Sequence, residues 1–469
     1  MLIQGCIDGK WVDRTTFSVQ SIFYPNYSVR VSGVTLLDTA RAIGAARSTG
    51  RLGFTERLER LESAADAFQY TPEVLEHTAK MSGLPVKVVR GLLDEIPVWF
   101  RQVAVAWQAR LGQFPASGAP AEVAALGAYK LLSPIDGYCY AVGPANDPRA
   151  SALVAANCAA AGVPLIFKAA KHDAVAPLVM QSLLSAGFDP AAFSLLYFDN
   201  REPDAPQKHH KLVAGSSLVW TFGPVEDVDR ALRYTGDPHS PSGQIDLFSD
   251  RRVLRHANAA CSTIISGALD AKMRKFLDDS LGFASGCTAT RSAMAVASPA
   301  VPGQLDEYLA SLKVGDPLEE ETQVGYILPG NLDYLARLLR KHALSIKVSG
   351  GQRLSPMQMS PVLVTAAHDL PDLFGAEIPA YFLAVRGCDS LEQAVERINA
   401  NTQALPRLAV SFYNQPADQA AAFAGQIRAK TVLLDQPTTR VAPFLHEGND
   451  YREWLCESKL LITDKNLAE

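Results

Sequence analysis

Between residues 137 and 221 the sequence alternates short strand-like segments with helix-like ones. The expected strands are Gly137–Val142, Pro164–Phe167, Phe193–Phe198 and Leu218–Thr221, and the expected helices between them include Ala150–Ala161 and Ala176–Ala186. Strands and helices that alternate at this spacing form a parallel sheet, which binds ligands at the carboxyl ends of its strands. This series therefore predicts an α/β domain with a ligand site at one edge.

A second α/β series follows, from a strand-like segment at Ala260–Ile265 to another at Ala409–Phe412. The chain has 469 residues, of which 48% are hydrophobic and 20% are charged. Single hydrophobic cores stop growing near ~250–300 residues, so we expect at least two lobes with separate cores. The composition excludes a disordered or collagen-like chain.

Charge and cysteine usage narrow the class of protein further. The formal net charge is -5, without the basic stripe that nucleic-acid or membrane partners require, so neither partner is expected. The N-terminal stretch Met1–Trp11 has no apolar signal-peptide core, and no segment is long and apolar enough to span a membrane. The seven cysteines form no CxxC pair, which favours a reducing, cytoplasmic compartment.

The strongest candidate for chemistry is a cysteine in a turn of small residues. Cys287 follows a predicted helix within the segment Phe283-Ala-Ser-Gly-Cys-Thr-Ala-Thr-Arg291 and precedes a predicted strand. A thiol in such a turn is accessible, and nearby backbone N–H groups favour its thiolate and can hold an oxyanion. The alternative is a buried structural cysteine, since cysteine is among the most buried residue types.

Two polar residues follow strands of the first series. Asn146 lies in a turn just before the alanine-rich helix, where its amide could donate to an oxyanion or simply cap the helix. Lys168 ends a buried strand at the edge where ligands bind, or else is a solvated strand-end lysine. No P-loop, HExxH, GxSxG, GxGxxG or zinc-type spacing occurs, so no metal is expected, and His209–His210 is expected in a surface loop.

Together, Asn146, Lys168 and Cys287 resemble the aldehyde dehydrogenase superfamily, in which Asn, Lys and Cys follow in this order. The resemblance extends over essentially the whole chain and includes Val314-Gly-Asp-Pro-Leu318, Glu377-Ile-Pro and Asp389-Ser-Leu-Glu-Gln-Ala394. The string Cys287-Thr-Ala-Thr-Arg291 is closest to the branch that oxidises CoA-linked semialdehydes in aromatic degradation.

The resemblance implies a mechanism and a set of site residues. The Cys287 thiolate attacks an aldehyde, Asn146 and the Cys287 N–H hold the oxyanion, and hydride transfer to NAD or NADP leaves a thioester. Lys168 and Glu377 would bind the two riboses of the cofactor. Thr221 and Gly223 belong to the turn that faces the cofactor phosphates, here Trp220-Thr-Phe-Gly-Pro224 in place of the family's F-T-G-S.

The sequence departs from the family pattern at several of these places. Ala284–Ser285 replaces the usual Gly-Gln before the cysteine, and Pro224 removes an N–H from the phosphate turn. Pro443-Phe-Leu-His-Glu-Gly448 replaces the usual P-F-G-G loop, and His256 occupies the place of the glutamate base.

The replacement at His256 leaves three interpretations open. His256 acts as the base, a thiol such as coenzyme A accepts the acyl group without a base, or the site has decayed. The function classes are accordingly an NAD(P)-dependent aldehyde dehydrogenase making an acid or acyl-CoA, an acyl-CoA reductase running in reverse, and a non-catalytic relative.

The fold implied is two Rossmann-type parallel-sheet domains with a small β oligomerisation arm. We expect the cofactor-binding domain at 1–114 and 139–245, the catalytic domain at 246–435, and the arm at 115–138 and 436–469. Exposed strand edges on such an arm pair across an interface, so a homodimer or homotetramer is expected. The aldehyde itself is not specified; Trp99, Phe100, Trp107 and Phe444 are candidates for an apolar substrate funnel.

Lys171 predicts a preference for NADP. NAD-preferring relatives often carry a glutamate at this position, and an ammonium attracts the 2′-phosphate that a carboxylate would repel. Measuring KM for both cofactors in the wild type and in Lys171→Glu tests this, with a shift toward NAD expected in the variant. Equal preference in both proteins would contradict it.

Overall fold

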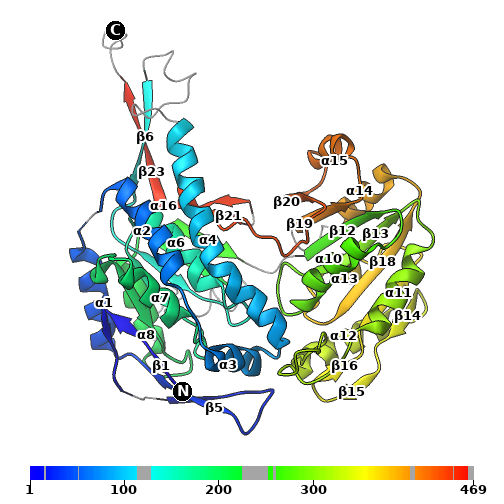
Figure 1. The fold of residues 1–469 in the computed structure, drawn as a ribbon, viewed down its shortest axis with the longest axis horizontal. Coiled ribbons are helices and arrows are strands. Elements are labelled where there is room, and N and C mark those ends of the chain that lie inside the picture. The colour runs from blue at the N-terminus through cyan, green and yellow to red at the C-terminus, as the bar shows by residue number, and fades with distance from the viewer. Residues whose placement is uncertain are drawn as a thin grey trace, which may run out of the picture.

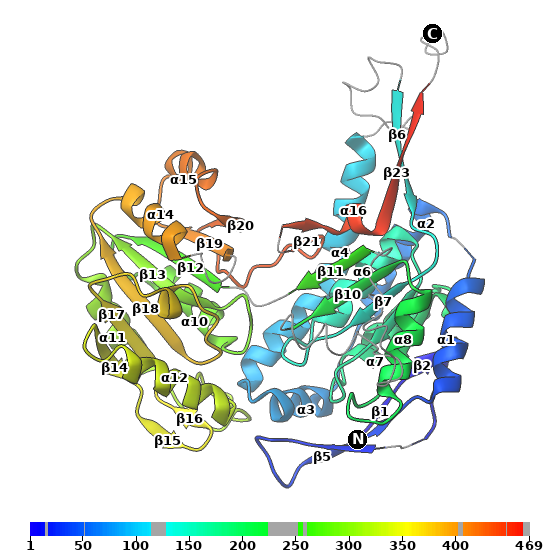
Figure 2. The same ribbon diagram turned by 180° about the vertical axis from the view of Figure 1, so that it is seen from behind.

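The computed structural model describes residues 1–14, 17–50, 52–113, 128–223, 252–256, 260–401, 407–446 and 448–462. These residues form two α/β domains that stand side by side, with a two-stranded arm projecting from the first (Figures 1 and 2). The α/β fold class with two parallel-sheet domains and a β arm is therefore confirmed.

The first domain is built on a sheet of seven described strands. Its order is β11 (Arg252–His256), β10 (Leu218–Phe222), β7 (Cys139–Val142), β8 (Leu165–Lys168), β9 (Phe193–Leu196), β2 (Cys6–Ile7) and β3 (Lys10–Trp11). The five strands from β11 to β9 are parallel, while β2 and β3 are antiparallel to their neighbours. The strand order changes direction between β7 and β10, which places a ligand crevice at their carboxyl ends.

The second domain repeats this architecture with another seven described strands. Their order is β14 (Ile346–Gly350), β17 (Val362–Ala366), β18 (Phe382–Cys388), β13 (Thr290–Val296), β12 (Ala260–Ser266), β19 (Arg407–Tyr413) and β20 (Ala429–Leu434). All pairs are parallel except β14 with β17. Nearly every residue of β12, β13 and β19 is buried, as expected for parallel strands covered on both faces.

Helices cover both faces of each sheet. In the first domain they are α1 (Leu36–Ser48), α2 (Phe54–Ala67), α3 (Pro72–Ser82), α4 (Val86–Gln113), α6 (Ala150–Ala161), α7 (Ala176–Ser185), the 3₁₀ turn η1 (Pro190–Ala192), α8 (Ala205–Gly215) and α16 (Tyr451–Leu455). In the second they are α10 (Ala271–Gly282), α11 (Val301–Ser311), α12 (Pro329–Lys341), α13 (Pro371–Phe374), α14 (Leu391–Ala400) and α15 (Ala417–Ala424). The main hydrophobic core of each domain is separate, as the chain length predicts.

Smaller β elements complete the described fold. A three-stranded sheet joins β1 (Leu2–Gln4), β5 (Ser28–Ser32) and β4 (Phe17–Gln20), and short pairs join β15 (Arg353–Ser355) to β16 (Gln358–Met359) and β21 (Leu445–His446) to β22 (Asn449–Asp450). The arm pairs β6 (Ala128–Pro134) with β23 (Cys456–Ile462) in antiparallel register.

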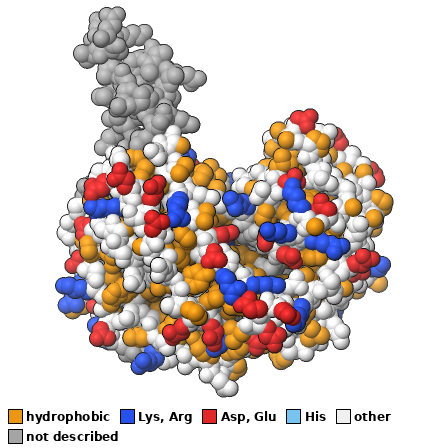
Figure 3. All heavy atoms as spheres, in the orientation of Figure 1, with side chains coloured by type: hydrophobic (Ala, Val, Ile, Leu, Met, Phe, Trp, Pro, Cys, Tyr) orange, Lys and Arg blue, Asp and Glu red, His pale blue; other side chains and the backbone are white. Residues whose placement is uncertain are grey.

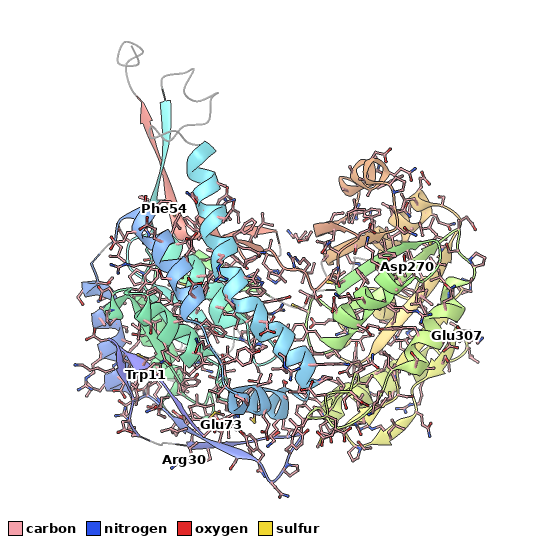
Figure 4. The ribbon with its side chains drawn as sticks, in the orientation of Figure 1. Trp11, Arg30, Phe54, Glu73, Asp270 and Glu307 are labelled. Atoms are coloured by element: carbon pink, nitrogen blue, oxygen red, sulfur yellow. The ribbon has the colours of Figure 1, made fainter. Side chains whose placement is uncertain are left out.

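Local sequence explains several helix ends. Thr35 caps α1 with a capping box, in which its hydroxyl accepts from the Asp38 N–H and the Asp38 carboxylate accepts from the Thr35 N–H. Asp270, labelled in Figure 4, caps α10 by accepting from the Met273 N–H at 2.7 Å. Gly162 ends α6 in the left-handed region at φ +76°, which glycine adopts without strain.

Two predicted boundaries are corrected. Strand β11 pairs with β10, so residues 252–256 belong to the first sheet, and the second sheet begins at Ala260 rather than at 246. The arm is narrower than expected, because Tyr451 and Leu455 are fully buried in the core of the first domain and only Cys456–Ile462 pairs with β6. The predicted segments 115–127, 224–250 and 463–469 lie outside the described residues.

The expectation for His209–His210 was wrong. Both residues lie in α8, not in a loop, and His209 is buried. Its Nδ1 lies 2.7 Å from the Tyr140 hydroxyl, and burial lowers its pKa to about 3. His209 is therefore a neutral structural residue between α8 and the first sheet. Within the part of the chain that is described, no helix is long and apolar enough to cross a membrane.

Asn157 ties three elements of the first domain together, and replacing it should destabilise the fold. Its amide donates to Leu153 O (2.8 Å) and Pro443 O (2.7 Å) and accepts from the Trp107 indole N–H (3.4 Å). In Asn157→Ala these buried partners lose their hydrogen bonds, so we expect the free energy of unfolding to fall by about 1–3 kcal/mol in urea titrations. The exposed Asn26→Ala is the control, and an equal effect in both variants would contradict the prediction.

Candidate active site

A cavity of about 760 Å³ lies between the two domains and is lined by residues of both. The loops after the strands of the first sheet form one wall, and the Cys287 turn and the Glu377 loop form the other. The space-filling view shows the notch between the domains (Figure 3). Every predicted site residue except Thr221 lines this cavity: Asn146, Lys168, Lys171, Gly223, His256, Cys287 and Glu377.

Cys287 sits in the tight turn that the sequence predicts. The turn is closed by hydrogen bonds from the Gly286 N–H to Phe283 O (2.9 Å) and from the Ala289 N–H to Gly286 O (3.2 Å). A side chain at Gly286 would come within 2.4 Å of the Phe283 ring, so the turn needs glycine there. Cys287 is the partly exposed cysteine of the chain, while the others are buried. Its thiol is therefore the accessible one.

Asn146 reaches from the first domain onto this turn. Its Nδ2 donates to Ser285 O at 2.8 Å, two residues before Cys287. An amide has two N–H groups, so the other one remains to donate to a ligand in the cavity. The asparagine is thus not a helix cap: the residue preceding α6 is Arg149, and no side chain caps that helix. This contact places an amide N–H donor beside the turn that carries Cys287.

Lys168 ends β8 with its ammonium buried but unpaired. The side chain is only 7% exposed, and among the described residues its ammonium has no hydrogen bond or ion pair; it lies 5.3 Å from the centre of the Phe198 ring. Burial lowers its pKa to about 8. A buried amine that faces a cavity without a protein partner fits a ligand rich in hydroxyl groups, such as the ribose of a dinucleotide.

Lys171 is paired with a carboxylate that sequence reasoning missed. Its ammonium lies 2.9 Å from Asp199, which also accepts from Arg201. The hydrogen bonds from Arg201 and Lys171 hold the pKa of Asp199 far below its usual range. Asp199 also lines the cavity, so a cofactor ribose would meet both charges. In the sequence, only the position of Asp199 shortly after the strand that ends at Leu196 could have indicated it as a site residue.

Thr221 does not line the cavity, which corrects its prediction. Trp220 and Phe222 stack on one another at 6.3 Å and 17°, and Phe222 faces the cavity. Successive side chains of a strand point to opposite faces of the sheet, so Thr221 points away from the face on which Phe222 lies. Thr221 is buried there, at 1% exposed. Gly223 lines the cavity, but its N–H donates to His256 O at 2.9 Å. Pro224 lies outside the described residues.

His256 ends β11 within an aromatic stack. Its ring stacks on Phe222 (4.7 Å, 18°) and on His446 (5.3 Å, 26°), and its Nε2 lies 3.1 Å from the Tyr451 hydroxyl. His446 lines the same cavity and was missed by sequence reasoning. In the sequence, His446 could have been noticed because it lies in the segment 443–448, which departs from the family pattern. The fold therefore places two imidazoles on the wall that faces the thiol turn.

Of the residues predicted to form a substrate funnel, Trp99 lines the cavity. Phe100 and Trp107 are buried in the core of the first domain. The apolar lining of the cavity includes Trp99, Leu153, Phe283 and Val441. Among the described residues no group of three or more metal-ligating side chains is present.

No family model matches the sequence, and no curated protein matches it. Solved structures do match over almost the entire chain. A salicylaldehyde dehydrogenase from Pseudomonas putida G7 superposes with a TM-score of 0.79 and 17% identity, covering 98% of each chain. An NAD-dependent aldehyde dehydrogenase from Sinorhizobium meliloti has a TM-score of 0.78 at 16% identity, covering 98% of this chain and 94% of that one.

The chain has the aldehyde dehydrogenase fold. An NADP-dependent enzyme from E. coli matches similarly, with a TM-score of 0.76, 16% identity and coverage of 98% and 97%. This fold places the cavity between its two sheet domains, where the residues described above meet.

The buried charge of Lys168 should weaken the fold at neutral pH. Because the pKa is lowered from 10.5 to about 8, the unfolded chain binds more protons between these values, and stability rises with pH there. At pH 7 the charged lysine costs about 3 kcal/mol, since each pKa unit corresponds to about 1.4 kcal/mol. We expect Lys168→Met to be more stable than the wild type in urea at pH 7, with a smaller gain at pH 10. The exposed Lys211→Met serves as control, and no gain in Lys168→Met would contradict the account.

Proposed function

We propose that this protein is an NAD(P)-dependent aldehyde dehydrogenase that works through a thiohemiacetal and a thioester on Cys287. The observation that carries the proposal is the hydrogen bond from Asn146 to Ser285 O, which brings an amide donor to the accessible thiol. The fold is shared with an enzyme described as an NAD-dependent aldehyde dehydrogenase and with one described as an NADP-dependent enzyme.

The chemistry begins at the thiol. The Cys287 thiolate adds to the carbonyl carbon, forming a C–S bond and moving the carbonyl π electrons onto oxygen. The Asn146 amide and the Cys287 N–H donate to this oxyanion, which lowers the barrier because both donors are held in place before the reaction. Neither group has to be reorganised during the step.

The cavity also fits a dinucleotide. The unpaired ammonium of Lys168 would hold the hydroxyls of the adenosine ribose, and Glu377, on the opposite wall, would accept from those of the nicotinamide ribose. When bound, the cofactor supplies the acceptor for the two electrons and the hydrogen lost as the thiohemiacetal becomes a thioester. Lys171 and Asp199 would bear on the choice between NAD and NADP through their opposite charges.

Release of the acyl group needs a nucleophile. His256 stands where the family carries its glutamate base, and the Tyr451 contact orients its ring. We propose that His256 removes a proton from water, which then attacks the thioester, expels the Cys287 thiolate and gives the carboxylic acid. Release to coenzyme A, which would not need this base, is the alternative.

The apolar residues that line the cavity with Cys287 favour an aromatic or other apolar aldehyde. This agrees with neighbours described as a benzaldehyde dehydrogenase from Corynebacterium glutamicum and a salicylaldehyde dehydrogenase, both sharing the fold. A small charged aldehyde would lose its hydration against this apolar lining without gaining a polar partner there.

The test is a screen of aromatic and aliphatic aldehydes with NAD+ or NADP+, with and without coenzyme A. We expect reduced cofactor and an acid product, loss of all activity in Cys287→Ser, and a fall in kcat of at least tenfold in Asn146→Ala. In His256→Asn the acyl-enzyme should accumulate and be detectable by mass spectrometry. Inactivity with every aldehyde in a folded protein that binds the cofactor would overturn the proposal.

A further inference from the structure

Arg291 is a buried cation directly beneath the thiol turn. It lies at the start of β13, in the middle of the second sheet (Figure 2), and its side chain is 1% exposed. Among the described residues no carboxylate lies within ion-pair distance of its guanidinium, and its Nε has no hydrogen-bond partner. A buried charge that makes no close ion pair lowers stability unless its hydrogen bonds offset that cost.

Among the residues that the structure describes, the guanidinium bonds only to backbone carbonyls, which belong to the Cys287 turn and the Glu377 loop. It donates to Ala284 O and Gly286 O (3.4 Å), on either side of Ser285, whose carbonyl accepts from Asn146. It also donates to Ala380 O (2.8 Å), three residues after Glu377. One side chain therefore ties the thiol turn to the Glu377 loop.

The charge of Arg291 also interacts electrostatically with Glu377 and with the thiols of Cys261 and Cys287. Burial lowers its pKa to about 10, which leaves it protonated near neutrality, and interactions with Glu377, Cys261 and Cys287 oppose that lowering. By reciprocity the guanidinium favours the thiolate form of Cys287. The other titratable groups on the cavity wall carry both signs: Asp147, Lys168, Lys171, His172, Asp199, His256, Glu377 and His446.

We propose that Arg291 is a positioning residue for the nucleophile: it holds the turn that presents Cys287 and keeps a positive charge beneath the thiol. The role rests on the proposed function, in which Cys287 attacks the aldehyde. Lysine could supply the charge, but its single nitrogen cannot match the planar fork that reaches carbonyls of both loops.

The chain offers a matched control. Arg407, at the start of β19, is likewise 1% exposed, and burial likewise lowers its pKa to about 10. Its guanidinium donates to Phe374 O (2.6 Å) and interacts with the thiol of Cys261, which in turn donates to Cys287 O (3.4 Å). Substituting it removes an equally buried charge from the same domain but leaves the hydrogen bonds from Arg291 to Ala284 O, Gly286 O and Ala380 O in place.

The experiment measures the rate of Cys287 alkylation by iodoacetamide from pH 6 to 10, with Cys287→Ser as the blank. In Arg291→Met we expect the profile to move up by at least about one pH unit, so that alkylation at pH 7 slows roughly tenfold, whereas Arg407→Met should keep the wild-type profile. An unchanged profile in Arg291→Met, or equal shifts in both variants, would overturn the proposal.

Arg291→Lys keeps the proposal testable if the methionine variant does not fold. Since lysine cannot hold both loops, amide hydrogen exchange of residues 284–287 should speed up at least about fivefold, and wild-type exchange there would overturn the positioning role. Neither readout uses substrate or cofactor. A protein with the predicted thiol behaviour but no aldehyde oxidation would therefore count against the proposed function and not against Arg291.

Discussion

The hydrogen bond from Asn146 to Ser285 O joins the two halves of the site. The asparagine comes from the loop after β7 in the first sheet, and the carbonyl comes from the thiol turn before β13 in the second. Each domain contributes only part of the candidate site. The first supplies the amide of Asn146 and the ammonium of Lys168, and the second supplies the thiol of Cys287 and the carboxylate of Glu377. Arg291 also donates to Ala284 O and Gly286 O, so the Cys287 turn is held from both sides.

Much of the fold could be predicted from the sequence because parallel strands and their helices leave strong local patterns. The helix at Ala150–Ala161 is present as expected. The position of β11 could not be predicted, since the order of strands in a sheet depends on long-range pairing. His209 was misassigned for a similar reason: adjacent histidines look solvated until a buried partner such as Tyr140 is known.

The residues of the candidate site likewise fall into those that the sequence predicted and those that it did not. Cys287, Asn146 and Lys168 could be found because each directly precedes or follows a predicted element. Asp199, His446 and Arg291 were missed, because their contacts with Lys171, His256 and the thiol turn are formed only in the folded chain. Thr221 failed because Phe222, not its neighbour, faces the cavity.

The turn at Trp220–Gly223, which the family resemblance assigns to the cofactor phosphates, differs most from the family pattern. The Gly223 N–H donates to His256 O, and Phe222 stacks on His256. Whether a dinucleotide binds there is the central claim, and thermal unfolding during titration with NAD+ and NADP+ tests it most directly. The account predicts a saturable rise in Tm with at least one of them, growing with the ratio of ligand to Kd. No rise with either cofactor at millimolar concentration would contradict the account.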